Sequence, residues 1–121
     1  MKMDTDPERI TSAFGTRVVT IDSHTAGEMT RLVMDCGSDV RGGTMAEKLE
    51  YFKSNLDHVR LRLTREPRGH RGVLAAAVTE SPTPDAEFGL IYMDAKRYPY
   101  LCGHATIGAV ATLAAAGMLE L

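Results

Sequence analysis

A cysteine, a glycine and a histidine stand in succession at Cys102-Gly103-His104, where a loop is expected to become an apolar helix. The start of a helix presents unpaired backbone N–H groups and a partial positive charge, and both favour the thiolate form of a cysteine. The same N–H groups can hold a carboxylate, and Gly103 allows it to approach closely. A thiolate beside an anchored carboxylate is what removal of the α-proton of an amino acid needs. Cys102 is therefore the candidate catalytic base, and Gly103 and His104 are candidate substrate-binding residues.

Three other interpretations of Cys102 stay open. A cysteine at a helix start can be a small buried hydrophobe. A Cys-x-His pair can bind a metal ion, although the sequence has no second pair at ligand spacing, so we expect no metal site. A Cys–His pair can also carry out acyl transfer, but residues two apart on a helix point in different directions. The spacing therefore disfavours direct contact between His104 and the thiol.

Weaker candidates lie in loops. His24 and Glu28 fall in a short polar link between two predicted strands, and loops carry functional residues more often than strands do. The alternative is that both are solvated turn residues. Residues 65–71 form a basic cluster, which could attract an anionic substrate or be an ordinary solvated loop. Cys36 lies on the apolar face of an alternating strand, so we expect it in the core.

The elements that must position these residues can be predicted from periodicity. Thr44 and Glu47 form a capping box ahead of a helix predicted over residues 45–56. A second helix is predicted from about Gly103, with Gly117 suited to the position after its end. The remaining periodic segments are β-branched or alternate between apolar and polar residues, as strands do: 17–22, 30–36, 59–63, 73–79 and 88–93.

The second helix is apolar almost all round, which is typical of a buried helix. We expect its core face to consist of Ile107, Val110, Ala111 and Ala114. The element order β-β-α-β-β-β-α predicts an α+β domain in which an antiparallel or mixed sheet wraps around this buried central helix. Residues 1–16 are polar and predict a loose leader, so the domain is expected over residues 17–121.

The composition narrows the classes of function. The 121 residues suffice for one domain or part of one, with 44% hydrophobic and 25% charged residues, close to a globular average. A net charge of −2 suggests no nucleic-acid partner. No apolar run reaches the length of a membrane span, and we expect no membrane association. Two cysteines are too few for a disulfide framework, which favours a reduced, cytoplasmic setting.

Four segments, in order along the chain, resemble the proline racemase family, which groups proline racemases, hydroxyproline 2-epimerases and trans-3-hydroxy-L-proline dehydratases. Each segment is short, but all four occur in register over most of residues 17–119. They are Ile21–Glu28 with Thr30-Arg31, Glu66–Arg71, Pro84–Gly89 with Met93-Asp94, and Tyr98–Gly108.

The resemblance implies a fold like that of diaminopimelate epimerase, in which two similar halves each wrap a sheet around a central helix and the active site lies between them. It implies chemistry without pyridoxal phosphate, other cofactors or a metal. Cys102 matches the first catalytic cysteine of the family, and Gly103 and His104 match residues that contact the substrate.

The family's second catalytic residue comes from the second half, and it is a cysteine in racemases and epimerases and a threonine in dehydratases. We expect residues 17–121 to be the N-terminal half and the C-terminal half to be missing. The expected function is cofactor-independent racemisation or epimerisation of proline or hydroxyproline. The alternatives are a trans-3-hydroxy-L-proline dehydratase and a catalytically incomplete fragment or binding remnant. The isolated chain is expected to be inactive, with a homodimer through Cys102 as a further alternative.

Overall fold

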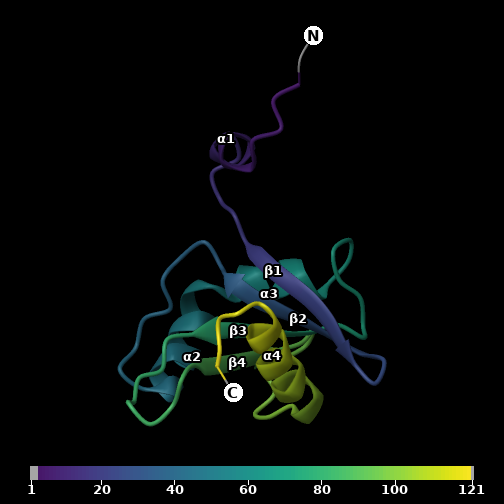
Figure 1. Cartoon of the computed structure of the whole chain (residues 1–121). Helices are drawn as coiled ribbons and strands as arrows, with labels where there is room; N and C mark the ends of the chain where they lie inside the picture. Colours follow the sequence, from purple (N-terminus) through teal and green to yellow (C-terminus); the bar gives the residue numbers. More distant parts are fainter. Residues whose placement is uncertain (1–2, 121) are drawn as a thin grey trace.

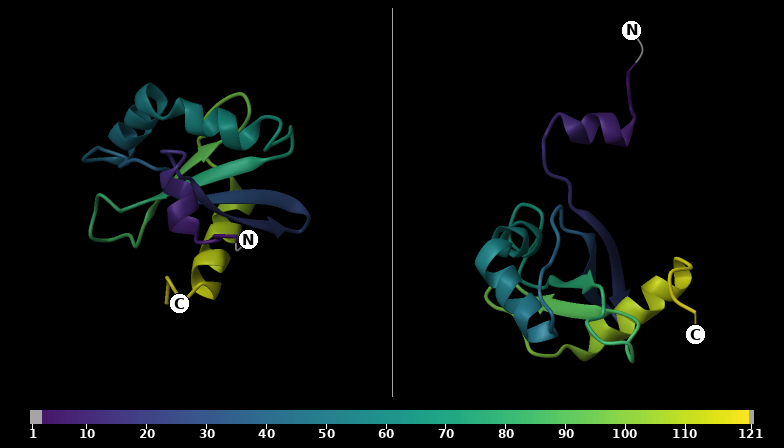
Figure 2. Two further views of the ribbon diagram at one scale, coloured as in Figure 1. Left: turned by 90° about the horizontal axis from the view of Figure 1, so that it is seen from above. Right: turned by 90° about the vertical axis from the view of Figure 1, so that its left-hand side faces the viewer.

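The computed structural model describes residues 3–120 and contains one sheet with helices on both of its faces (Figure 1). The sheet order is β1-β2-β3-β4. Along the chain, the elements are α1 (Pro7–Ser12), β1 (Val19–Thr25), β2 (Glu28–Asp35), α2 (Met45–Asn55), α3 (Asp57–Thr64), β3 (Leu74–Thr79), β4 (Gly89–Met93) and α4 (Gly103–Ala115). Figure 2 shows α2 and α3 on one side of the sheet and α4 on the other. The predicted α+β class with a mixed sheet is confirmed.

The strand pairing follows from the connections. Two residues, Ala26 and Gly27, join β1 to β2, and both have positive φ (51° and 90°), as the tightest antiparallel hairpins require. β2 and β3 are parallel, which needs a crossover, and α2 and α3 provide it. β3 and β4 are antiparallel again. The sheet is therefore mixed because one of its three connections is helical.

Alternation along the strands gives the sheet two apolar faces. Val33, Ala75 and Met93 pack toward α2 and α3, in the same cluster as Phe52 and other buried residues of these helices. On the opposite face, Leu32 and Ala76 pack against Ala109 and Leu113 of α4. The alanines of β3, one of the two inner strands, leave room for helices on both sides. Cys36 is buried in the first cluster, as predicted, so the sheet separates it from α4.

The helix α4 packs on the sheet with a different face from the predicted one. Ala105, Gly108, Ala109 and Leu113 are buried, whereas Ile107 is 62% exposed. Because α4 is apolar on nearly every side, its composition could not identify the face that meets the sheet. Its end is as predicted: Gly117 has φ 74°, and the N–H groups of Gly117 and Met118 donate to the carbonyls of Ala114 and Leu113.

Residues 59–63 were predicted as a strand, and this prediction is wrong, because they lie within α3. The buried residues Val59 and Leu63 are four apart, which fits a helix face as well as alternation does. The strand pattern placed Arg60 on a polar face, whereas in the structure Arg60 is buried and pairs with Asp57, one helical turn earlier.

The helix 45–56 and its cap are confirmed, since Thr44 Oγ1 accepts the N–H of Glu47 at 3.1 Å. Within the predicted leader, Pro7–Ser12 form the short helix α1, capped by Asp6, with no buried residue; Figure 2 shows it standing away from the sheet. Among residues 3–120, every helix falls short of the length and apolarity that a membrane span requires.

Candidate active site

Cys102 is the N-cap residue of α4, directly before the first helical residue. Its backbone is extended (φ −136°, ψ 115°), and its side chain makes no capping hydrogen bond. The thiol is half-buried, and its sulfur lies 3.2 Å from Nδ1 of His104. The expectation that these side chains would not meet is therefore wrong. The helical rule fails because Cys102 is outside the helix, and its extended backbone turns the thiol toward His104.

The helix start next to this thiol has free space at Gly103. A Cβ built on Gly103 would meet no other atom within 4 Å, so the first turn of α4 is uncrowded there. The first N–H groups of a helix have no partner within the helix and carry partial positive charge. A thiol and an imidazole in contact therefore lie at the start of α4, next to its first backbone donors.

Two hydroxyl residues that the sequence analysis did not identify hold this helix start. Thr106 Oγ1 donates to the carbonyl of Cys102 at 2.8 Å, and the Thr106 N–H donates to the same carbonyl at 3.1 Å. Tyr92 of β4 is hydrogen-bonded through its hydroxyl to Thr106 Oγ1. Thr106 could have been found from its spacing of four from Cys102. Tyr92 could not, because its role depends on which face of β4 meets α4.

His24 and Glu28 were predicted in a loop, and this prediction is wrong, because His24 belongs to β1 and Glu28 begins β2. The strands extend to a two-residue turn, and the structure does not join either residue to Cys102. Nδ1 of His24 accepts the N–H of Gly27 at 3.3 Å, and Glu28 is exposed. The residues on either side of His24 face α4: Thr25 Oγ1 donates to the carbonyl of His104, and Ser23 lies beside Gly108. Strand alternation therefore places His24 on the opposite face of the sheet.

The basic cluster of residues 65–71 lies on the face of the sheet opposite α4. Arg31 of β2 reaches it, and its Nη1 donates to the carbonyls of Leu63 and Arg68, both at 2.8 Å. The other side of the same guanidinium pairs with Asp22 at 3.0 Å. Arg31 thus connects strands β1 and β2 to the loop after α3. These contacts give the Arg-Gly-His segment a structural role in holding the crossover to the sheet.

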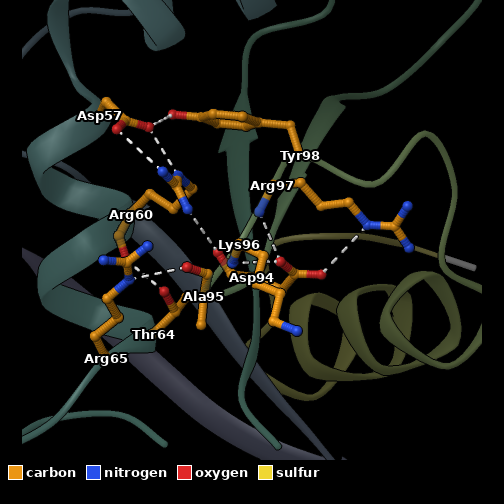
Figure 3. Close-up of polar contacts among 9 residues, drawn as sticks. All are labelled: Asp57, Arg60, Thr64, Arg65, Asp94, Ala95, Lys96, Arg97 and Tyr98. Carbon is orange, nitrogen blue, oxygen red and sulfur yellow. Dashed lines mark hydrogen bonds and ion pairs between the residues drawn. The ribbon is translucent and has the colours of Figure 1, made fainter. Parts of the chain in front are cut away.

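A polar cluster of Asp57, Arg60 and Tyr98 fixes the loop that leads from β4 to Cys102 (Figure 3). The Tyr98 hydroxyl donates to Asp57 at 2.6 Å, and Arg60 makes two hydrogen bonds to the same carboxylate, at 2.7 and 3.1 Å. Arg60 also donates to the carbonyl of Asp94, and Arg65 donates to that of Ala95. The residues 94–98 are therefore tied to α3, four residues before the candidate base.

This cluster predicts an acid-dependent part of the stability. Hydrogen bonds from Arg60 lower the pKa of Asp57, burial partly opposes this, and the Tyr98 hydroxyl adds to the lowering. Because the pKa of Asp57 is lower in the folded than in the unfolded state, its ionised carboxylate stabilises the fold at pH values above the unfolded pKa of about 4. This stabilisation is lost as the pH falls through the folded pKa. We expect Asp57→Asn to destabilise the fold at neutral pH by about 1–2 kcal/mol.

The measurement is thermal unfolding of both proteins between about pH 3 and pH 7, the range that spans an ordinary carboxyl pKa. The gap between the melting temperatures should narrow toward acid, because the carboxyl of the unfolded chain takes up its proton before the folded one, whose pKa is lowered. Glu50→Gln, which alters a carboxylate 3.8 Å from Lys53 on the surface of α2, is the matched control. A gap that stays constant with pH would show that the Asp57 charge contributes nothing.

Comparison with known proteins places the sequence and the fold in one family. Residues 20–121 match the sequence model of the family "Proline racemase". The proline racemase of Clostridioides difficile is 42% identical over 106 residues, which cover 88% of this chain and 32% of that protein. A 4-hydroxyproline 2-epimerase of Streptosporangium roseum is 41% identical over 102 residues (84% and 30%). The human trans-3-hydroxy-L-proline dehydratase is 42% identical over 94 residues (77% and 27%).

Solved structures show the same fold. A hydroxyproline epimerase from Agrobacterium vitis, with bound trans-4-hydroxy-L-proline, superposes with a TM-score of 0.77 at 21% identity, over 86% of this chain and 31% of that one. A probable proline racemase from Agrobacterium radiobacter K84, with bound carbonate, gives 0.78 at 23% identity, over 87% and 32%. The chain thus spans about a third of the length of these relatives. Sequence and fold agree over nearly the whole of the described domain, and the chain belongs to the proline racemase family.

Proposed function

We propose that this chain supplies one of the two proton-transferring groups of a proline or hydroxyproline racemase or epimerase, with Cys102 as the base. The single observation that carries the proposal is the thiol at the start of α4, 3.2 Å from an imidazole nitrogen of His104. The family relationship supports the same reaction class, because relatives of about equal similarity bear the names proline racemase and 4-hydroxyproline 2-epimerase.

The proposed step is a proton transfer. The thiolate of Cys102 takes the α-proton of the substrate and becomes a thiol, and the electron pair of the C–H bond stays on the α-carbon. An acid on the opposite face of that carbon then donates a proton, which inverts the configuration. The N–H groups at the start of α4 hold the substrate carboxylate, which also bears part of the developing negative charge. His104, in contact with the sulfur, stabilises the thiolate when its ring is protonated.

We infer that the opposite acid comes from a second half of the kind that the family resemblance implies, with Cys102 of a second copy of this chain as the alternative. Cys36, the other cysteine, is buried between the sheet and helices α2 and α3, whereas Cys102 lies at the start of α4 on the other face. A single thiol can remove a proton but cannot deliver one to the far side of the same carbon. We therefore expect the 121-residue chain alone to show no racemisation of L-proline or of a hydroxyproline.

A segment exchange tests the proposal directly. The 106-residue stretch of the Clostridioides difficile proline racemase that matches this chain is replaced by the corresponding residues of this chain. Racemisation of L-proline, followed by optical rotation and by α-deuterium incorporation from D2O, should be measurable in the hybrid and absent in the isolated chain. A folded hybrid without activity, or an active isolated chain, would contradict the proposal.

A dehydratase is the second candidate function. The human relative, 42% identical to this chain over the matched residues and named trans-3-hydroxy-L-proline dehydratase, supports it. Its first step would be the same removal of the α-proton by Cys102, after which the 3-hydroxyl leaves as water and the resulting enamine becomes an imine. The same exchange into the human dehydratase, with loss of trans-3-hydroxy-L-proline as the readout, tests this candidate. Because each host supplies its own second catalytic residue, activity in only one hybrid would show which kind of second half the residues of this chain can work with.

A further inference from the structure

A chain of hydrogen bonds connects the sheet to the backbone of Cys102. Thr106 has a single hydroxyl proton, and it is directed to the carbonyl of Cys102 at 2.8 Å. The contact between Tyr92 and Thr106 must therefore have the tyrosine hydroxyl as donor. The hydrogen bonds run in one direction, from Tyr92 through Thr106 to the Cys102 carbonyl. Such chains polarise each member and strengthen it.

We propose that Tyr92 and Thr106 are positioning residues for Cys102, a role that rests on the proposed function of that thiol and extends it. The Cys102 carbonyl belongs to the same peptide unit as the N–H of Gly103, and in a planar trans peptide the two groups point in opposite directions. A carbonyl held toward Thr106 therefore directs the Gly103 N–H outward from the helix start, toward the place proposed for the substrate carboxylate.

At the sheet, the hydrogen-bond chain starts from a well-packed strand. Tyr92 pairs with Ala76 of β3, and its neighbours Ile91 and Met93 are 3% and 0% exposed on the other face. The helix end has fewer supports. Thr25 Oγ1 donates to the His104 carbonyl at 3.3 Å, and Gly103 has no side chain that could pack against a neighbour. The Thr106 N–H also donates to the Cys102 carbonyl, at 3.1 Å, so without the Tyr92 hydroxyl this peptide keeps its helical hydrogen bond and loses the side-chain support that fixes its tilt. We expect the contact between the sulfur and His104 to loosen as a result.

The experiment measures thiol reactivity in the whole 121-residue chain. Iodoacetamide labelling of Cys102 and Cys36 is followed separately by peptide mass spectrometry at about pH 7 and about pH 9.5, on either side of an ordinary thiol pKa. The Cys102 rate at the lower pH divided by its rate at the higher pH reports how readily the thiolate forms. Access to the sulfur affects both rates equally and cancels in this ratio. Cys36, buried in the core, reports opening of the fold.

Four variants separate positioning from stability. Tyr92→Phe and Thr106→Val each remove one hydroxyl of the chain, and the Cys102 rate ratio should fall about threefold to tenfold, the range expected for one hydrogen bond. Thr106→Ser keeps a hydroxyl and should retain the wild-type ratio. Tyr51→Phe removes a tyrosine hydroxyl in α2, on the other face of the sheet, and should leave the Cys102 ratio unchanged.

An unchanged Cys102 ratio in Tyr92→Phe, or a Thr106→Ser variant that behaves like Thr106→Val, would overturn the positioning role. Faster labelling of both cysteines at both pH values in Tyr92→Phe, with an unchanged ratio, would show a stability effect only and would overturn it too. These readouts use no substrate. A failure of the proposed function, seen in the hybrid enzyme, is therefore distinguishable from a failure of this inference.

Discussion

Replacing Cys102 by serine in the hybrid racemase should lower α-deuterium incorporation into proline by about 10²- to 10⁴-fold, the contribution of a positioned general base. A serine hydroxyl is far less acidic than a thiol and stays protonated near neutral pH, so it cannot accept the α-proton. The substitution changes one atom and removes no capping hydrogen bond, since the Cys102 side chain makes none. The fold and the helix start should therefore survive.

The matched control is Cys36→Ser, the same replacement at the other cysteine of the chain. Cys36 is 8% exposed and belongs to the cluster under α2 and α3, so its loss should affect stability and leave deuterium incorporation per folded molecule unchanged. Incorporation and the melting temperature are measured on both variants. Cys102→Ser with wild-type exchange would remove Cys102 from the mechanism.

Replacing Gly69 by alanine should destabilise the fold by about 1–3 kcal/mol, the cost of overpacking a rigid site. A Cβ built at Gly69 would lie 2.4 Å from the carbonyl carbon of Thr64 and 2.7 Å from the carbonyl oxygen of Leu63. Both are backbone atoms at the end of α3, so no side-chain rotation relieves the contact. The same segment accepts Arg31 at the Arg68 carbonyl, and a shift there would loosen the connection to β2.

Gly43→Ala serves as the control for this prediction. Its Cβ would meet only the carboxylate of Glu47 at 3.5 Å, an ordinary contact with a flexible side chain. Urea unfolding of the two variants and the wild type gives the free energies of unfolding. Equal midpoints for Gly69→Ala and the wild type would mean that the loop after α3 moves away at no cost.

Local signals predicted most of the elements. The capping box at Thr44, the glycine after α4 and the prolines between β3 and β4 each act within a few residues, so the chain shows them without tertiary contacts. The error at residues 59–63 has a physical cause. Alternation and helical spacing both place Val59 and Leu63 on one face, and only the crossover between parallel strands and the Asp57–Arg60 pair select the helix.

The face of α4 that meets the sheet depended on packing. Ile107 and Ala109 are both apolar, and the few polar residues of α4 (His104, Thr106 and Thr112) are spread around the helix and mark no single outer side. The sheet accepts the side with the smallest residues, where Gly108 lies beside Ser23, Thr25 and Thr30. When α4 lies close to the sheet, the two gain more van der Waals contact than they would gain by burying Ile107 with the helix farther away.

The sequence by itself determined that a cysteine stands at the start of an apolar helix, and that four segments in register resemble one family. These are properties of neighbouring residues and of their order. Only the tertiary structure decided that the thiol meets His104, that Tyr92 contacts Thr106 beside the Cys102 carbonyl, and that His24 lies on the far face of the sheet from α4. Each depends on strand register and on a cap conformation, which long-range packing selects among several locally equivalent arrangements.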